Sequence, residues 1–196
     1  MNFMDNRIIV LCGFQGSGKD YLASELKKRG FDFIISHTTR PMRPNESEEN
    51  PYYFTTKEKF LEMIENDEFL EYRTYNTLVE NIPDIWYYGV NKKAVKENSA
   101  YVVVLDKLGL IEFKKEFKDR VISFYIDTSD KNRYDRANSR GGFNLQEWER
   151  REIADKKEFE GIFDIVDGVI DNNDNKLNTL KSLLFRISMK EDDFCD

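Results

Sequence analysis

The feature that most constrains this chain is the eight-residue stretch Gly-Phe-Gln-Gly-Ser-Gly-Lys-Asp at residues 13–20. It follows an apolar run at residues 8–12 and precedes residues 21–29, whose leucine spacing predicts a helix. A strand, a glycine turn and a helix start give the pattern GxxxxGK its mechanism, because backbone N–H groups and the helix N-terminus then face a phosphate chain. The stretch therefore predicts a nucleoside triphosphate ligand. The expected binding residues are Gly13, Gly16, Ser17, Gly18, Lys19 and Asp20.

The last residue of the stretch departs from the usual pattern, which ends in Ser or Thr. Asp20 stands there instead. A carboxylate is a hard oxygen ligand for Mg²⁺, so Asp20 is a candidate metal ligand, although it adds negative charge beside the phosphates. The alternative is a glycine turn without a ligand, but the strand before it and the helix after it favour a phosphate loop.

Composition limits the class of protein. A length of 196 residues predicts one domain, and 40% hydrophobic with 34% charged residues describe a soluble globular chain. No apolar run approaches the roughly 20 residues of a membrane span, and no signal peptide is apparent, so a cytoplasmic location is expected. One histidine and two distant cysteines exclude a histidine-rich metal site and a disulfide framework. A net charge of −7 argues against non-specific nucleic-acid binding.

Apolar runs alternate with helical spacings along much of the chain. Residues 101–105 and 121–126 are continuous apolar runs, typical of central strands buried on both faces. Asp106 follows the first of them, at the carboxyl end where open α/β sheets place their ligands. The alternation predicts an α/β fold with a parallel sheet flanked by helices. Further strands are expected at 31–36 and 166–171, and helices at 91–98, 108–117 and 177–187.

Residues 52–90 contain signals for short strands and one helix. Thr55 and Glu58 have the capping-box spacing, so a helix should follow them and end near residue 67. Residues 76–85 contain Pro83 and no clear periodicity, and are predicted to form a loop. Short strands are expected at 52–55, 69–75 and 86–90.

Two clusters of basic residues suggest further anion contacts. Arg40 and Arg43 lie on a proline-stiffened loop and could present two guanidinium forks to one phosphate. A second cluster falls on two predicted helices, which Gly141 and Gly142 separate. Asn144 should begin the second of these helices. Such helices could close over phosphates as a flap. The alternative for both clusters is a set of solvated surface charges. The second cluster comprises Lys131, Arg133, Arg136, Arg140, Arg150 and Arg151.

With these motifs in order, the sequence resembles the guanylate kinase family over nearly its whole length. The most specific matches are residues 36–43 (Ser-His-Thr-Thr-Arg-Pro-Met-Arg), Tyr52, residues 68–71 (Glu-Phe-Leu-Glu) and the Tyr-Tyr-Gly at 87–89. The resemblance implies a P-loop kinase fold and transfer of the γ-phosphoryl group of ATP, with Mg²⁺, to GMP or dGMP. It also implies three parts. These are a core (1–36, 91–128 and 164–190), an acceptor-binding subdomain (37–90) and a helical lid (129–163).

The resemblance also assigns roles to individual residues. Lys19 and three lid arginines would act on the migrating phosphoryl group. Glu71 resembles the carboxylate that accepts hydrogen bonds from guanine, and Asp106 resembles an acidic residue near the metal and acceptor. His37 receives no catalytic role. The lid arginines are Arg136, Arg140 and Arg151. The acceptor ligands are Ser36, Arg40, Arg43, Tyr52, Glu71, Tyr88, Val90 and Asp106, and the metal ligands are Asp20 and Asp106. The implied partners are small nucleotides, without nucleic acid or membrane.

Three departures keep other interpretations open. Asp20 replaces a hydroxyl residue, Val90 occupies a position that usually carries a hydroxyl, and residues 76–85 are longer than usual. Gly-Lys-Asp and Tyr-Tyr-Gly-Val also resemble ribose 1,5-bisphosphokinase, a relative of the same fold. A second alternative is a non-catalytic guanylate-kinase-like scaffold, although such domains tend to lose the glycines or the lysine of the phosphate loop.

Overall fold

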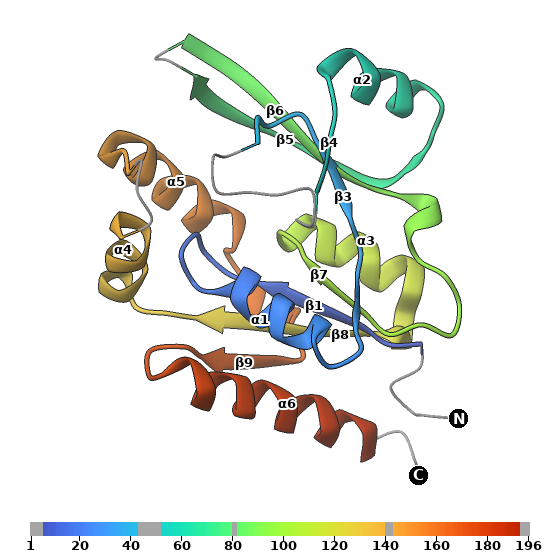
Figure 1. The fold of residues 1–196 in the computed structure, drawn as a ribbon, viewed down its shortest axis with the longest axis vertical. Helices are drawn as coiled ribbons and strands as arrows, with labels where there is room; N and C mark the ends of the chain where they lie inside the picture. The colour runs from blue at the N-terminus through green and yellow to red at the C-terminus, as the bar shows by residue number, and fades with distance from the viewer. Residues whose placement is uncertain (1–5, 43–51, 80–81, 140–142, 193–196) are drawn as a thin grey trace. The chain divides into compact units, whose positions relative to one another are not determined.

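The computed structural model describes residues 6–42, 52–79, 82–139 and 143–192 of the chain (Figure 1). It divides into two compact units. The larger unit comprises Met1–Asp32 and Asn98–Asp196, and the smaller unit comprises Phe33–Glu97. Among the described helices, none is long and apolar enough to cross a membrane.

The larger unit is built on a five-stranded sheet with the order β2-β7-β1-β8-β9. The central strand β1 pairs in parallel with β7 and β8, and β8 pairs in parallel with β9. Every residue of β1 is buried, as expected for a strand covered on both faces. The predicted parallel sheet is confirmed. Its strands are β1 (Ile8–Cys12), β2 (Asp32–Phe33), β7 (Tyr101–Val104), β8 (Val121–Asp127) and β9 (Gly168–Asp171).

Helices flank this sheet (Figure 1). The helices that contact the strands bury apolar residues, such as Leu22 and Leu26 of α1 and Leu110 and Phe113 of α3. Burying one such side chain contributes about 1.5–3 kcal/mol. The helices that contact the strands are α1 (Lys19–Lys27), α3 (Lys107–Phe117) and α6 (Lys176–Asp192). The unit also contains α4 (Asp130–Asn138), α5 (Leu145–Glu158) and the 3-10 turns η2 (Lys118–Arg120) and η3 (Ile162–Asp164).

The smaller unit is a four-stranded sheet with the order β4-β3-β6-β5. β3 pairs in parallel with β4 and antiparallel with β6, and β5 pairs antiparallel with β6. The strands are β3 (Ser36–Thr38), β4 (Tyr52–Phe54), β5 (Phe69–Val79) and β6 (Ile82–Asn91).

One helix, α2 (Lys57–Glu65), covers part of this small sheet. Phe60 and Met63 on α2 form a buried cluster with Phe69, and the rings of Phe60 and Phe69 stack with centroids 4.4 Å apart. The cap of α2 is Thr56, whose side chain accepts from the N–H of Lys59 at 3.2 Å. The predicted cap at Thr55 was therefore one residue early.

The predicted loop at 76–85 was wrong, because the strands on either side of it are longer than expected. β5 continues to Val79 and β6 begins at Ile82, with Leu78 opposite Pro83 in the register. Within the described residues, β3 pairs with β6 only near Tyr88 and Gly89, so in this part of the chain β6 has a partner strand on one side alone at Pro83. A strand tolerates proline at such a position.

Two further elements differ from the sequence prediction. The strand expected at 31–36 is divided, because β2 ends at Phe33 and β3 begins at Ser36. The helix expected at 91–98 is a single 3-10 turn, η1 (Lys92–Ala94), which Asn91 caps by accepting from the N–H of Lys93 at 2.9 Å.

Candidate active site

The phosphate loop, residues 13–20, joins β1 to α1 and needs its glycines for both conformation and space. Gly13, Gly16 and Gly18 have φ angles of 144°, 73° and 96°, which disfavour residues with a Cβ. A Cβ on Gly16 would lie 2.8 Å from the backbone oxygen of Arg133, and one on Gly18 would lie 2.5 Å from Nδ2 of Asn172. The loop can therefore bring its backbone N–H groups close to an anion.

Lys19 is the first residue of α1 and its side chain folds back over the loop. Its Nζ donates to the carbonyl oxygens of Gly13 and Phe14, the latter at 2.8 Å, and to Oγ of Ser17 at 3.3 Å. Burial lowers the pKa of Lys19, while the nearby carboxylates of Asp20 and other residues act in the opposite direction. The structure thus places a cation directly on the loop that would bind phosphate.

Residues that follow other parallel strands hold the loop at the Ser17 carbonyl. This oxygen accepts from Nδ2 of Asn172 at 2.6 Å and from Oγ1 of Thr128 at 3.1 Å. Thr128 follows β8 and Asn172 follows β9, so the contacts gather at the carboxyl edge of the sheet. Sequence analysis missed both residues. Their position just after predicted strands was the signal that could have identified them.

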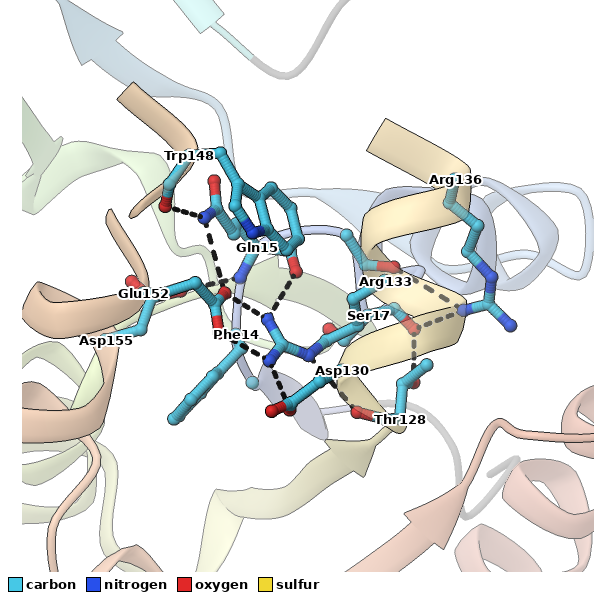
Figure 2. Close-up of polar contacts among 12 residues, drawn as sticks. Phe14, Gln15, Ser17, Thr128, Asp130, Arg133, Arg136, Trp148, Glu152 and Asp155 are labelled. Carbon is cyan, nitrogen blue, oxygen red and sulfur yellow. Dashed lines mark hydrogen bonds and ion pairs between the residues drawn. The ribbon is translucent and has the colours of Figure 1, made fainter. Parts of the chain in front are cut away.

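The arginines predicted to lie in the lid differ in their contacts. Arg136 contacts the loop, because Nη1 lies 3.3 Å from the Ser17 carbonyl oxygen (Figure 2). Its Nη2 donates to the carbonyl of Asn172 at 2.7 Å. Arg151 instead donates from Nε to Glu147 within α5 at 2.6 Å. Arg140 lies outside the described residues. Only Arg136 of the two described arginines is therefore in contact with the loop.

The N-terminus of α5 carries the predicted cap and an ion-pair cluster. Asn144 accepts from the N–H of Glu147 at 3.0 Å, which confirms the predicted helix start. Burial acts to raise the pKa of Glu147, but hydrogen bonds from Arg150 and Arg151 outweigh it and hold the pKa below its usual value.

The two predicted metal ligands both belong to the larger unit. Asp20 is exposed in the first turn of α1. Asp106 is the N-cap of α3, where its Oδ1 accepts from the N–H of Gly109 at 2.6 Å. No group of three or more acidic, histidine or cysteine side chains that could hold a metal occurs among the described residues. The two carboxylates, Asp20 and Asp106, fit the way Mg²⁺ is usually bound, by one or two carboxylates together with substrate phosphates.

In the smaller unit, several predicted acceptor ligands gather around an arginine. Arg40 is 4% exposed, and its guanidinium lies 5.5 Å and 5.4 Å from the ring centroids of Tyr52 and Phe54. The Tyr52 ring also contacts the Tyr88 ring, with centroids 5.9 Å apart. Ser36 lies opposite Tyr52 in the register of β3 and β4. Such stacking fixes the orientation of the guanidinium. Arg43 lies outside the described residues.

The predicted base-reading residues face each other on the hairpin of β5 and β6. Glu71 and Val90 are register partners and are 9% and 0% exposed. The guanidinium of Arg73 lies 3.7 Å from the Glu71 carboxylate. The structure therefore holds a largely buried carboxylate, which can only accept hydrogen bonds when ionised, beside an apolar side chain.

Comparison with known proteins identifies the family. The family model described as guanylate kinase matches residues 5–187. The chain belongs to the guanylate kinase family. A guanylate kinase of Synechococcus sp. (strain JA-3-3Ab) is 32% identical over 187 residues, covering 91% of this chain and 82% of that protein. A guanylate kinase of Gloeobacter violaceus is 34% identical over 152 residues, covering 74% and 70% of the two chains.

A solved structure supports the fold of this guanylate kinase family member. The crystal structure of guanylate kinase from Anaplasma phagocytophilum matches with a TM-score of 0.64 and 23% identity, covering 95% of this chain and 87% of that chain. The resemblance stated from the sequence is thus confirmed. The family model and the two named relatives favour guanylate kinase over ribose 1,5-bisphosphokinase and over a non-catalytic scaffold.

Proposed function

We propose that this protein transfers the γ-phosphoryl group of ATP to GMP or dGMP and uses Mg²⁺. The observation that carries the proposal is the phosphate loop, with its left-handed glycines and Lys19 folded onto it at the start of α1. The relatives named guanylate kinase support the acceptor. The three-part division into core, acceptor-binding subdomain and lid, and the cytoplasmic location, belong to the same proposal.

At the donor end, the protein supplies position and charge. Phosphoryl transfer requires in-line alignment and stabilisation of the phosphate oxygens rather than a nucleophilic side chain. The loop N–H groups and the N-terminus of α1 would bind the phosphate chain, with Lys19 and Arg136 adding positive charge. We assign the same role to Arg140 and Arg151, which would require Arg151 to exchange its contact with Glu147 for phosphate.

Bound Mg²⁺ would neutralise phosphate charge and orient the phosphates. Asp20 and Asp106 are the residues that would hold it, as carboxylates on the first turn of α1 and at the end of β7.

At the acceptor end, Glu71 would select guanine. Guanine presents N1–H and an exocyclic amino group on one edge, and one carboxylate can accept from both, whereas N1 of adenine is an acceptor. Val90 removes at most one neutral hydrogen bond to the base, worth about 1 kcal/mol. A polar site whose hydrogen bonds a wrong substrate cannot match lowers kcat/KM for that substrate by a factor of roughly 10⁴. The larger effect decides, so GMP and dGMP remain the expected acceptors. Ser36, Arg40, Arg43, Tyr52 and Tyr88 would bind the acceptor, chiefly its phosphate.

The test is an acceptor panel that measures ADP release from ATP and Mg²⁺. The acceptors are GMP, dGMP, AMP, UMP, dTMP and ribose 1,5-bisphosphate. We expect GMP or dGMP to be preferred over AMP by on the order of 10⁴ in kcat/KM. If ribose 1,5-bisphosphate outperforms GMP, or if no acceptor is phosphorylated, the proposed function is wrong.

A variant pair tests the residue that would make this choice. Glu71→Gln replaces one acceptor oxygen with a donor amide, so kcat/KM for GMP should fall about 100-fold, which corresponds to the loss of roughly one charge-assisted hydrogen bond. ATP binding should be unchanged. The matched control is Glu65→Gln, which alters an exposed glutamate of α2 and should leave GMP use as it is. Equal GMP kinetics in the two variants would contradict the role of Glu71.

A further inference from the structure

Helix α4 buries a single side chain, and that side chain is charged. All of Asp130–Asn138 is described, and Arg133, at 1% exposure, is its one buried residue. A guanidinium taken out of water is costly unless its N–H groups are hydrogen bonded and its charge is paired. Burial at this position therefore requires specific partners.

The guanidinium of Arg133 has a partner on every nitrogen (Figure 2). Nε donates to the Thr128 carbonyl at 3.2 Å, and Nη1 donates to the Gln15 carbonyl at 3.3 Å and to Glu152. Nη2 donates to Glu152 Oε2 at 2.7 Å and to Asp130 at 2.8 Å. The pair with Glu152 is a two-point fork, the geometry that distinguishes arginine from lysine.

The same guanidinium lies between two aromatic rings. Its central carbon is 4.8 Å from the ring centroid of Phe14 in the phosphate loop and 5.6 Å from that of Trp148 in α5. Arg133 thus touches the loop through Phe14 and Gln15, and α5 through Trp148 and Glu152. It links α4 and α5 to the phosphate loop, whose Gln15 lies 118 positions earlier in the sequence.

Gln15, in the middle of the loop, is held at its backbone N–H, its carbonyl and its side-chain nitrogen. Its N–H donates to Asp155 Oδ2 at 2.7 Å, its carbonyl accepts from Arg133, and its side-chain Nε2 donates to the Trp148 carbonyl at 2.9 Å. The next residue is Gly16, which adopts a positive φ. Helices α4 and α5 therefore set the backbone of the loop at the point where it turns.

We propose that Arg133, paired with Glu152, is a positioning residue for the triphosphate-binding loop. It acts through Gln15 and Phe14. By fixing these two residues it sets the direction of the loop N–H groups. It also holds α4, which carries Arg136, in place against the loop. The inference rests on the proposed function insofar as it takes ATP to be the ligand of the loop.

The test compares Glu152→Gln and Arg133→Lys with the parent protein. Glu152→Gln keeps the size of the side chain but removes the charge, and Arg133→Lys keeps the charge but removes the fork. We expect the Kd of ATP, measured by calorimetry without acceptor, to rise about tenfold in each, while the Kd of GMP changes less than twofold. The double variant should be no worse than the poorer single variant, because both changes act through the same pair.

Local amide exchange gives a second readout. Peptides covering residues 13–20 should exchange faster in Glu152→Gln, while peptides covering β9 and α6 should exchange as in the parent. The matched control is Arg29→Lys, which alters an arginine that pairs with Glu25 by a 2.8 Å contact at the far end of α1. The control should leave both ATP binding and loop exchange unchanged.

The outcomes separate this inference from the proposed function. If the melting temperature falls in both variants but the Kd of ATP stays within twofold and loop exchange is unchanged, Arg133 only stabilises the fold and the inference is wrong. If the parent binds ATP but phosphorylates no acceptor, the proposed function fails while the ATP measurements still decide the inference. If the parent does not bind ATP, both are overturned. Should Arg133→Lys fail to fold, Glu152→Gln decides alone.

Discussion

The single histidine offers a residue-level test of burial. His37 is the one histidine of the chain, so its ring gives one resonance to follow by NMR. Its ring packs against Tyr53 and Phe69, with centroids 5.1 Å and 5.8 Å apart. Burial lowers the pKa of His37 below its ordinary value of 6.5, although Glu68 opposes the shift. We expect the titration of this resonance to show a pKa below 6.5.

The sign of the effect on stability follows from linkage. The unfolded chain takes up the proton near the ordinary pKa, and the folded chain only at lower pH, so the free energy of unfolding falls as pH drops from about 7 through that window. His37→Gln should remove this part of the pH dependence in urea denaturation between about pH 7 and pH 5. An NMR pKa at or above 6.5, or an identical pH slope in the variant, would contradict the burial argument.

At the same scale, sequence reasoning identified residues whose role is local. The roles of the loop glycines and of Lys19 were predicted from a pattern of eight consecutive residues. The helix cap at Asn144 was predicted from a pattern of four. Arg133 is different, because its partners Gln15 and Glu152 are 118 and 19 positions away. A pairing over such a distance leaves no periodic trace in one sequence. Arg133 was therefore visible only as one member of a basic cluster.

Among the elements, α5 has polar contacts but no buried residue. None of its residues, Leu145–Glu158, is buried. It contacts the loop through Trp148, Glu152 and Asp155, whereas Arg150 and Arg151 pair with Glu147 on the helix itself. Elements with few buried apolar contacts open locally at low cost. We therefore expect α5 to be ordered further by phosphate.

Amide exchange tests this expectation. In a complex with ATP and the acceptor, exchange across α4 and α5 should slow relative to the free protein, because the arginines gain phosphate partners. ADP alone, or a salt solution of equal ionic strength, should not reproduce the change. Unchanged exchange in the two-substrate complex would favour the alternative that these are solvated helices with balanced charges.

The hairpin of β5 and β6 shows why an element can be missed. Pro83 and the polar residues around it led to the prediction of a loop at 76–85. The register shows that the hairpin continues because each of its strands pairs with the other beyond the reach of β3. A two-stranded ribbon has little burial to impose alternation on its sequence, so periodicity is weak where the pairing is nonetheless regular.

At the scale of the whole molecule, the parallel sheet was predictable for the opposite reason. β1 and β7 are covered on both faces, so burial forces continuous apolar runs such as residues 8–12 and 101–104. The order of the strands, β2-β7-β1-β8-β9, was not deduced from the sequence. The same burial makes all central strands alike, so their sequences do not say which neighbours they have.

Ligand binding to the whole molecule gives a last prediction, which does not depend on turnover. A ligand that binds only the folded state raises the free energy of unfolding by about 2.7 kcal/mol at 100 times its Kd. For a chain of this size that corresponds to roughly 5–11 °C in Tm. ATP at such a concentration should therefore produce a shift of this order in the parent protein, measured by differential scanning calorimetry. The shift in Lys19→Ala at the same ATP concentration should be smaller.

The variant separates binding from folding because Lys19 bonds to the loop itself, through Gly13, Phe14 and Ser17. Without ligand, Lys19→Ala should melt close to the parent. Burial lowers the pKa of Lys19, so the charged form of this side chain adds little to the free energy of unfolding. Phosphoryl transfer should fall by about a hundredfold or more, as when one preorganised charge is removed. GMP should still stabilise the variant, because Lys19 is not among its expected ligands, which apart from Asp106 lie in Phe33–Glu97. An ATP shift equal in parent and variant would mean that Lys19 does not contact the triphosphate.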